Sequence, residues 1–149
     1  MKLYDSVELV LKRKGSVVYS IAPDATVYQA LEKLAEKNVG ALAVMDGPML
    51  VGILSERDYV RKVILKGHSS RELRVSEIMS SPAVTVGPQC TIDECMQLMT
   101  DKRCRHLPVV ADGRMVGMVS IGDLVNWIIT AQDETIHQLE DYITGKYPA

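Results

Sequence analysis

The sequence contains two copies of one pattern, and this duplication limits the folds that the chain can adopt. When the chain is aligned with itself at a shift of 65 residues, residues 18–60 match residues 83–125 without a gap. The identical pairs are Pro23/Pro88, Thr26/Thr91, Lys37/Lys102, Leu42/Leu107, Val44/Val109, Val51/Val116, Gly52/Gly117, Ser55/Ser120, Asp58/Asp123 and Val60/Val125. Most other aligned pairs keep their chemical character. The chain is therefore predicted to be a tandem repeat.

Each copy shows the pattern of a short strand, a helix, a hairpin and a second helix. The runs VVYSIAP and AVTVGP are short β-rich segments that end at proline, and a capping box follows each, at 26–29 and 91–94. Apolar residues at helical spacing come next. The runs ALAVMDGPMLVGILS and HLPVVADGRMVGMVS predict β-hairpins, after which Ser55 and Ser120 begin the last helices. Each copy is predicted to be β-α-β-β-α.

We expect a mixed α/β fold of the α+β type that forms one module. Its predicted segments are an N-terminal helix over 1–16, a first repeat over 17–66, a connector over 67–82, a second repeat over 83–130 and a C-terminal helical extension over 131–149. A chain of 149 residues that is 47% hydrophobic can bury a sizeable core. Gly15 is expected to close the N-terminal helix, and VSEIM in the connector predicts a helical turn.

Composition argues against several classes of partner and location. The net charge of −2 leaves no strongly basic face, and one Trp with no Phe leaves little for stacking on bases, so we expect no nucleic-acid partner. No apolar run reaches the roughly 18 residues of a membrane span, and the N-terminus lacks a signal-peptide core, so we expect a cytoplasmic protein with no membrane partner. Three cysteines without a C-x-x-C pair predict reduced thiols, with no disulfide framework and no structural zinc site.

The motif GILSERD at 52–58 returns as GMVSIGD at 117–123, and two interpretations remain open. Ser at the N-cap and Asp three residues later stabilise a helix start by about 1 kcal/mol. The same arrangement suits a phosphorylated ligand, because the free N–H groups and the hydroxyl can donate to phosphate. A carboxylate one turn into the helix can also accept hydrogen bonds from the two hydroxyls of a ribose.

These features together resemble the CBS domains, named for cystathionine β-synthase, which occur as tandem pairs. The resemblance covers roughly residues 15–127 and depends on the duplicated order of elements, the two G-h-h-S-x-x-D motifs, VSEIM before the second unit and RHLPV at its hairpin. SIGDLV and TIHQLEDYITG are similar to segments of small bacterial stand-alone CBS-pair proteins. The resemblance implies two repeats related by a pseudo-twofold axis, with two clefts for an adenosine-bearing ligand: AMP, ADP, ATP or NAD, with S-adenosylmethionine less favoured.

The resemblance also implies roles for individual residues. Asp58 and Asp123 match the carboxylate that binds ribose, and Ser55 and Ser120 match the hydroxyl near the phosphate. The short first strands are implied to line the base pockets, through Ser20, Ile21, Thr85 and Val86. The implied cations near phosphate are Arg105, His106 and Arg57, and Gly40 and Ala41 replace the first two of these in the first copy, so the clefts are expected to be unequal. The family's homodimer contact is implied for Tyr59, Val60, Val63, Leu124, Val125 and Ile128.

Catalysis and metal binding have weaker support in the sequence. Cys104 and His106 stand on one strand edge without a convincing third ligand, so we expect no metal. No paired catalytic carboxylates or Ser-His-Asp order can be defended, so we expect no enzyme activity. The leading hypothesis is a regulatory module that senses an adenine nucleotide and signals to an unidentified partner protein. The alternative is a ligand-free dimerisation or protein-interaction module whose Ser-x-x-Asp motifs only cap helices.

Overall fold

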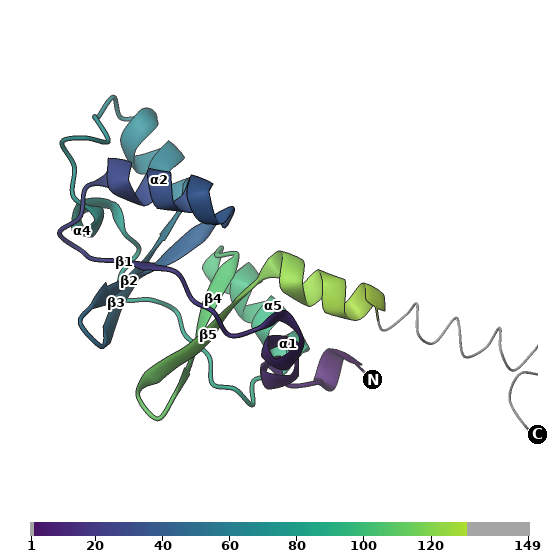
Figure 1. The fold of residues 1–149 in the computed structure, drawn as a ribbon. Helices are drawn as coiled ribbons and strands as arrows, with labels where there is room; N and C mark the ends of the chain where they lie inside the picture. The colour runs from purple at the N-terminus through teal and green to yellow at the C-terminus, as the bar shows by residue number, and fades with distance from the viewer. Residues whose placement is uncertain (1, 131–149) are drawn as a thin grey trace, which may run out of the picture.

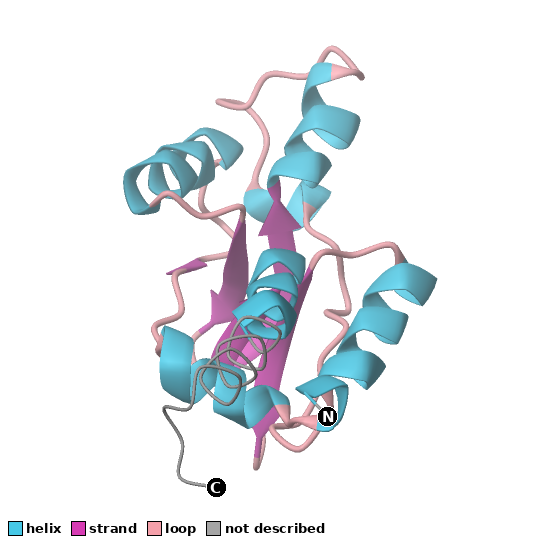
Figure 2. Cartoon of the chain, turned by 90° about the vertical axis from the view of Figure 1, so that its right-hand side faces the viewer, coloured by secondary structure: helices cyan, strands magenta, loops and turns pink. Residues whose placement is uncertain are grey.

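The protein folds into two α/β units that lie side by side, each built around a β-hairpin (Figure 1). The structure is a computed structural model that describes residues 2–130. In a view turned by 90°, helices lie on both sides of the strands (Figure 2). The mixed α/β architecture with two repeats confirms the fold class predicted from the sequence.

The elements follow the predicted order, except that the first strand of the second repeat is reduced to an isolated bridge. The N-terminal segment and first repeat contain the 3-10 helix η1 (Lys2–Tyr4), α1 (Val7–Lys14), β1 (Ser20–Ile21), α2 (Val27–Lys37), β2 (Ala41–Asp46), β3 (Met49–Ser55), α3 (Glu56–Tyr59) and the π-helical η2 (Val60–Ile64). The connector and second repeat contain α4 (Val75–Ile78), α5 (Ile92–Lys102), β4 (His106–Ala111) and β5 (Arg114–Ser120), and residues 121–130 continue as a helix. The predicted C-terminal extension, 131–149, lies outside the described residues.

The first strand of the second repeat is shorter than predicted, and Pro108 explains the difference. In the first repeat β1 pairs in parallel with β2, and the Ala43 N–H donates to the carbonyl of Tyr19 at 3.1 Å. Pro108 occupies the position that matches Ala43 and has no N–H to donate. Only a single parallel bridge, between Val86 and Val109, remains there. The predicted strand at Thr85 is therefore reduced to this bridge.

Each repeat has its own apolar core. The helix stripes predicted from the sequence are buried, with Val27, Ala30 and Leu34 of α2 in one core and Ile92, Cys95 and Met99 of α5 in the other. Both helices begin with the predicted capping box, in which a Thr hydroxyl accepts from the N–H three residues later. The two cores are thus built from matching positions.

The helix that precedes each repeat completes the core of the other repeat. Helix α1, which leads into the first repeat, buries Val7, Val10 and Leu11 in the core of the second. Helix α4, which leads into the second repeat, buries Val75 and Ile78 in the core of the first. The N-terminal helix is therefore the structural counterpart of α4 and not an addition outside the pair.

Matching backbone hydrogen bonds hold the two exchanged helices. The Val7 N–H donates to the carbonyl of Cys90 at 2.8 Å, and the Val75 N–H donates to the carbonyl of Ala25 at 2.8 Å. Two further pairs of bonds correspond in the same way. The Glu8 N–H donates to the Pro88 carbonyl as the Ser76 N–H donates to the Pro23 carbonyl. The Ile92 N–H donates to the Asp5 carbonyl as the Val27 N–H donates to the Leu73 carbonyl. The exchange therefore obeys the pseudo-twofold relation.

Each exchanged helix, or the residues directly after it, lies close to a glycine at the same position of the two hairpins. A Cβ added at Gly117 would lie 2.7 Å from both methyl groups of Leu11. A Cβ added at Gly52 would lie 2.8 Å from the sulfur of Met79 and 2.8 Å from the carbonyl oxygen of Ser80. The repeated glycine of the motif is thus explained by packing of the exchanged helices.

Two residues expected on the homodimer surface are instead buried. Val63 of η2 and Leu124 of the last described helix are both fully buried, because each turns inward to the core of its own repeat. Val60 and Val125 remain exposed on the same helices, at 48% and 40%. Of the predicted contact surface, only the outer faces of the two helices remain accessible. These faces carry Val60, Val125 and the half-buried Tyr59 and Ile128.

Gly52→Ala is expected to lower the free energy of unfolding by about 1–3 kcal/mol, as overpacking of a filled site does. Gly117→Ala is expected to cost less, because the side-chain tip of Leu11 can rotate away whereas the Ser80 carbonyl belongs to the backbone. Urea denaturation of the two variants beside the wild type measures both values. Equal losses, or a larger loss for Gly117→Ala, would contradict this account of the glycines.

Candidate ligand-binding clefts

Two clefts open between the repeats, and each combines the Ser-x-x-Asp motif of one repeat with the first strand segment of the other. The first cleft, about 540 Å³, takes Ser55 and Asp58 from the first repeat and Pro82–Val84 from the second. The second cleft, about 370 Å³, takes Ser120 and Asp123 from the second repeat and Val17–Tyr19 from the first. The structure therefore places four predicted residues, a Ser and an Asp per cleft, at matching positions.

The residues predicted for the base pockets do not line either cleft. The lining segments 17–19 and 82–84 lie just before the predicted pairs Ser20/Ile21 and Thr85/Val86. Ile21 packs against the first core and Val86 is buried in the second, so both side chains turn away from the clefts. The lining residues stand earlier in the sequence than predicted, because the chain passes the cleft first and pairs with the hairpin only afterwards.

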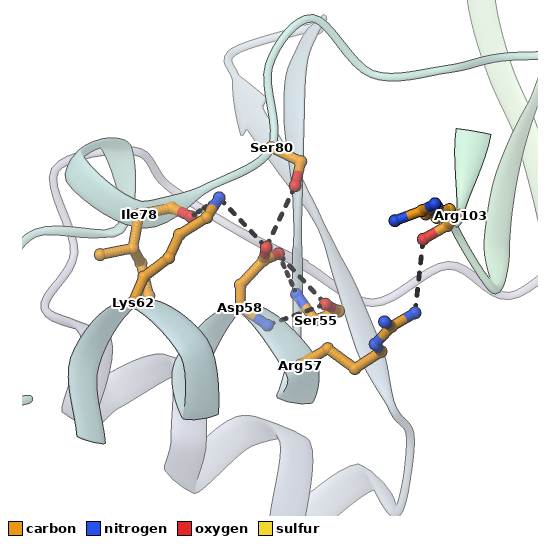
Figure 3. A network of polar contacts seen from close by, with 7 residues as sticks. All are labelled: Ser55, Arg57, Asp58, Lys62, Ile78, Ser80 and Arg103. Atoms are coloured by element: carbon orange, nitrogen blue, oxygen red, sulfur yellow. Dashed lines mark hydrogen bonds and ion pairs between the residues drawn. The ribbon is translucent and has the colours of Figure 1, made fainter. Parts of the chain in front are cut away.

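Asp58 is buried and uses both carboxylate oxygens within the protein (Figure 3). Its Oδ2 accepts from the N–H of Ser55 at 3.0 Å and from the Ser55 hydroxyl at 3.1 Å. Its Oδ1 accepts from the Ser80 hydroxyl at 3.1 Å and pairs with the Lys62 ammonium at 3.2 Å. The motif therefore forms a helix cap in this cleft, as the simpler interpretation predicts.

Asp123 is more open than Asp58. Its Oδ2 accepts from the N–H of Ser120 at 2.8 Å and also bonds the ammonium of Lys14, which extends from the end of α1. Among the described residues, Oδ1 of Asp123 has no hydrogen-bond partner, and the side chain is 25% exposed against 11% for Asp58. Lys14 also donates to the Met118 carbonyl at 2.8 Å. No signal in the sequence pointed to Lys14, because its partner Asp123 stands 109 residues away.

The two clefts differ strongly in charge, as the sequence predicts. The first cleft is lined by six basic and two acidic side chains: Arg57, Arg61, Lys62, Lys102, Arg103 and Arg105, with Glu56 and Asp58. The second has one of each, Lys14 and Asp123. Arg57 reaches across to the second repeat, where its guanidinium donates to the Arg103 carbonyl at 3.3 Å (Figure 3). The positions matching Arg57, Arg103 and Arg105 are Gly122, Asn38 and Gly40.

His106 and Gly40 form a wall that both clefts share. The two residues are in close contact, since a Cβ at Gly40 would lie 3.3 Å from the imidazole Cε1. Burial lowers the pKa of His106, and the positive charges of Lys14 and Arg105 lower it further, while the carboxylate of Asp123 opposes them. The imidazole is therefore held in its neutral form at this wall.

Cys104 lines the first cleft beside Arg103 and Arg105. Burial raises the pKa of the Cys104 thiol, which keeps it protonated and lowers its reactivity as a nucleophile. Within residues 2–130 no cluster of three or more His, Cys, Asp or Glu side chains is arranged to hold a metal ion. The predictions of no metal and no catalysis stay predictions.

Comparison with known proteins assigns the family. The fold is a tandem pair of α/β repeats with exchanged leading helices and two clefts between them. The model of the CBS domain matches residues 15–65 and 75–130, so the chain belongs to the CBS domain family. CBS domains generally bind adenosine ligands, and the proteins that carry them are typically regulatory. The matched ranges confirm the family resemblance and its two repeats.

Three relatives cover most of the described chain. CBS domain-containing protein CBSX3, mitochondrial, of Arabidopsis thaliana is 44% identical over 129 residues, which span 83% of this chain and 63% of the relative. CBS domain-containing protein YhcV of Bacillus subtilis is 33% identical and is matched over 72% of this chain and 76% of its own. A solved structure from Burkholderia ambifaria MC40-6, described as a candidate signal-transduction protein with CBS domains, has 45% identity and a TM-score of 0.82, covering 85% of this chain and 96% of that one.

Within residues 2–130 none of the helices combines the length and apolar character needed to cross a bilayer. The cytoplasmic location stays a prediction.

Replacing His106 is expected to reduce the loss of stability on acidification. Because the pKa of His106 in the fold lies below its unfolded value of about 6.5, the unfolded chain binds more protons, and stability decreases as pH falls below that value. Urea unfolding at pH 7.5 and 5.5 should show a smaller decrease for His106→Gln than for the wild type. The matched control is His68→Gln, which removes an exposed histidine outside both clefts. An equal decrease in His106→Gln and wild type would contradict the effect of burial.

Proposed function

We propose that the chain binds an adenine nucleotide, AMP, ADP, ATP or NAD, in the clefts between its repeats and signals the bound state to a partner protein. The observation that carries this proposal is the repeated construction of the clefts. In each, a carboxylate and a hydroxyl from one repeat face a strand segment of the other, so a ligand would contact both repeats at once. Membership of the CBS domain family supports the same ligand class.

The second cleft offers the more accessible sugar-binding group. A ribose diol donates two hydrogen bonds, and Oδ1 of Asp123 is open to accept one without displacing a protein donor in the described part of the chain. Lys14 lies beside the same carboxylate and supplies a cation for a single phosphate. This cleft therefore suits a nucleoside monophosphate.

The first cleft offers more charge for phosphate than the second. Four of its six basic side chains are arginines, which bind phosphate oxygens with paired N–H groups. Asp58 must exchange a bond from Ser80 or Lys62 for a ribose hydroxyl, so sugar binding costs more there. The excess of positive charge favours a di- or triphosphate and disfavours cationic S-adenosylmethionine.

Signalling would depend on a ligand that joins the two repeats. A nucleotide that contacts both repeats stabilises one relative arrangement and so shifts the population of surfaces that a partner meets. We place a homodimer contact on the outer faces of η2 and helix 121–130, where Val60 and Val125 are exposed. The partner protein has no signature in the described residues.

A ligand-free interaction module is the second candidate, and the state of Asp58 favours it. Both oxygens of this carboxylate already have protein donors, as expected for a helix cap with no further role. Nucleotide titrations separate the two candidates, because a ligand-free module binds no nucleotide and substitution of either Asp then changes only its stability.

Asp123→Asn is expected to weaken AMP binding by roughly 10- to 100-fold, since a charge-assisted hydrogen bond contributes about 1.5–3 kcal/mol. Isothermal titration calorimetry at fixed pH measures the dissociation constants of wild type and variant. Asp58→Asn, in the cleft whose carboxylate is already engaged, should affect AMP binding less.

The matched control is Glu94→Gln, which makes the same carboxylate-to-amide change at a capping box outside both clefts. Glu94→Gln should lower the melting temperature slightly and leave AMP binding unchanged. If AMP, ADP, ATP and NAD all fail to bind the wild type, or if Asp123→Asn binds AMP as the wild type does, the proposed function is wrong.

Arg105→Gln is expected to weaken ATP binding by about tenfold, which corresponds to 1.4 kcal/mol, and to change AMP binding less. The reason is that Arg105 adds to the positive charge of the first cleft, where the matching residue of the second is Gly40. Titrations of both nucleotides at low and high salt measure the difference, which salt should reduce. Arg114→Gln, at an exposed hairpin position outside both clefts, controls for net charge. Equal losses in the two variants would rule out a specific role for Arg105.

A further inference from the structure

Two cysteine thiols meet where the exchanged N-terminal helix joins the second repeat. The Sγ of buried Cys95 donates to the Sγ of the partly exposed Cys90 at 3.5 Å. Cys90 stands one residue before the N-cap Thr91, and Cys95 stands in the first turn of α5. These positions form the hydrophobic staple of a helix start, here made by two sulfur atoms.

The first repeat has no sulfur at the matching junction. Ala25 and Ala30 occupy the positions of Cys90 and Cys95, and the Ala25 carbonyl accepts from Val75 as the Cys90 carbonyl accepts from Val7. Alanine therefore satisfies the packing and hydrogen bonding of this junction. The structural role of a helix staple does not by itself require two thiols.

The environment gives the two thiols different chemical roles. Burial and the hydrogen bond to Cys90 raise the pKa of Cys95 to about 12, so Cys95 keeps its proton and donates it toward Cys90. Cys90 accepts this hydrogen bond, and it is the one of the two thiols that solvent reaches. Cys90 is thus placed as the attacking thiol and Cys95 as the resolving thiol.

We propose that Cys90 and Cys95 form a reversible disulfide when the protein meets hydrogen peroxide, which makes this junction a redox modification site. The Cys90 thiolate attacks one peroxide oxygen, the S–O bond forms, the O–O bond breaks and hydroxide leaves as water, giving a sulfenic acid. The Cys95 sulfur then attacks the Cys90 sulfur, the S–S bond forms, and the hydroxyl leaves with the Cys95 proton as a second water. Two thiols and one peroxide thus give one disulfide and two waters.

The site lies against the segment that carries the exchanged helix. Besides the bond from Val7 to Cys90, the carbonyl of Asp5 accepts from the Ile92 N–H at 2.9 Å, and Ser6 bridges Thr91. A disulfide here would tie the start of α5 to the residues that hold α1. The proposal is independent of nucleotide binding, since neither cysteine lines a cleft.

The test is peroxide treatment of the folded full-length chain, followed by alkylation in denaturant, digestion with trypsin and mass spectrometry without reductant. Trypsin cleaves after Arg74, Lys102 and Arg103, so Cys90 and Cys95 stay on the fragment 75–102 while Cys104 is separated from it. The expected result is that the fragment resists alkylation and loses about 2 Da, the mass of two hydrogens. The three free thiols should fall by two, and dithiothreitol should restore them.

Two variants make the result specific. Cys104→Ser should form the same disulfide, because Cys104 takes no part in it. Cys95→Ala, which installs the residue that the first repeat carries, should form no disulfide and should leave a sulfenic acid on Cys90 that dimedone traps. The proposal is overturned if the wild-type fragment 75–102 keeps both thiols alkylatable, if it becomes linked to the Cys104 fragment, or if Cys90 is oxidised to sulfinic acid without a disulfide.

Discussion

The exchange of leading helices is the constraint that holds the molecule together. Val7, Val10 and Leu11 are buried in the core of the second repeat, and Val75 and Ile78 are buried in the core of the first. Neither repeat can leave the other without exposing these side chains to water, and burial of each such side chain contributes about 1.5–3 kcal/mol. The two repeats therefore fold as one unit, although their cores are separate.

The clefts follow from the same exchange. After crossing over, the chain passes the Ser-x-x-Asp motif of the other repeat, and there Ser80 bonds Asp58 and Lys14 bonds Asp123. One connection supplies a hydroxyl and the other an ammonium, and these two side chains stand at different positions of the pseudo-symmetric pair. The segment that fixes the position of each repeat thus also sets how open each carboxylate is.

The features that recur at a shift of 65 residues could be predicted from the sequence. They are the two repeats, the capping boxes and both Ser-x-x-Asp motifs. Sequence reasoning missed the role of the N-terminal helix because Val7 matches Val75 at a shift of 68 residues, three more than in the rest of the repeat. Pro108 gave a readable signal for the shortened strand, since proline has no N–H to donate. Lys14 and Arg103 gave none, because only the fold brings distant segments together.

The identities between the copies and their differences serve separate physical needs. Gly52 and Gly117 allow the exchanged helices to approach, and Asp58 and Asp123 cap helices in both repeats, so these positions cannot diverge without cost to the scaffold. Three arginines that line the first cleft, Arg57, Arg103 and Arg105, are matched in the other copy by Gly122, Asn38 and Gly40. Because charge on an open surface affects stability little, this lining is free to differ while the backbone stays the same. The duplication thus yields one scaffold with two electrostatic environments, which share the wall formed by His106 and Gly40.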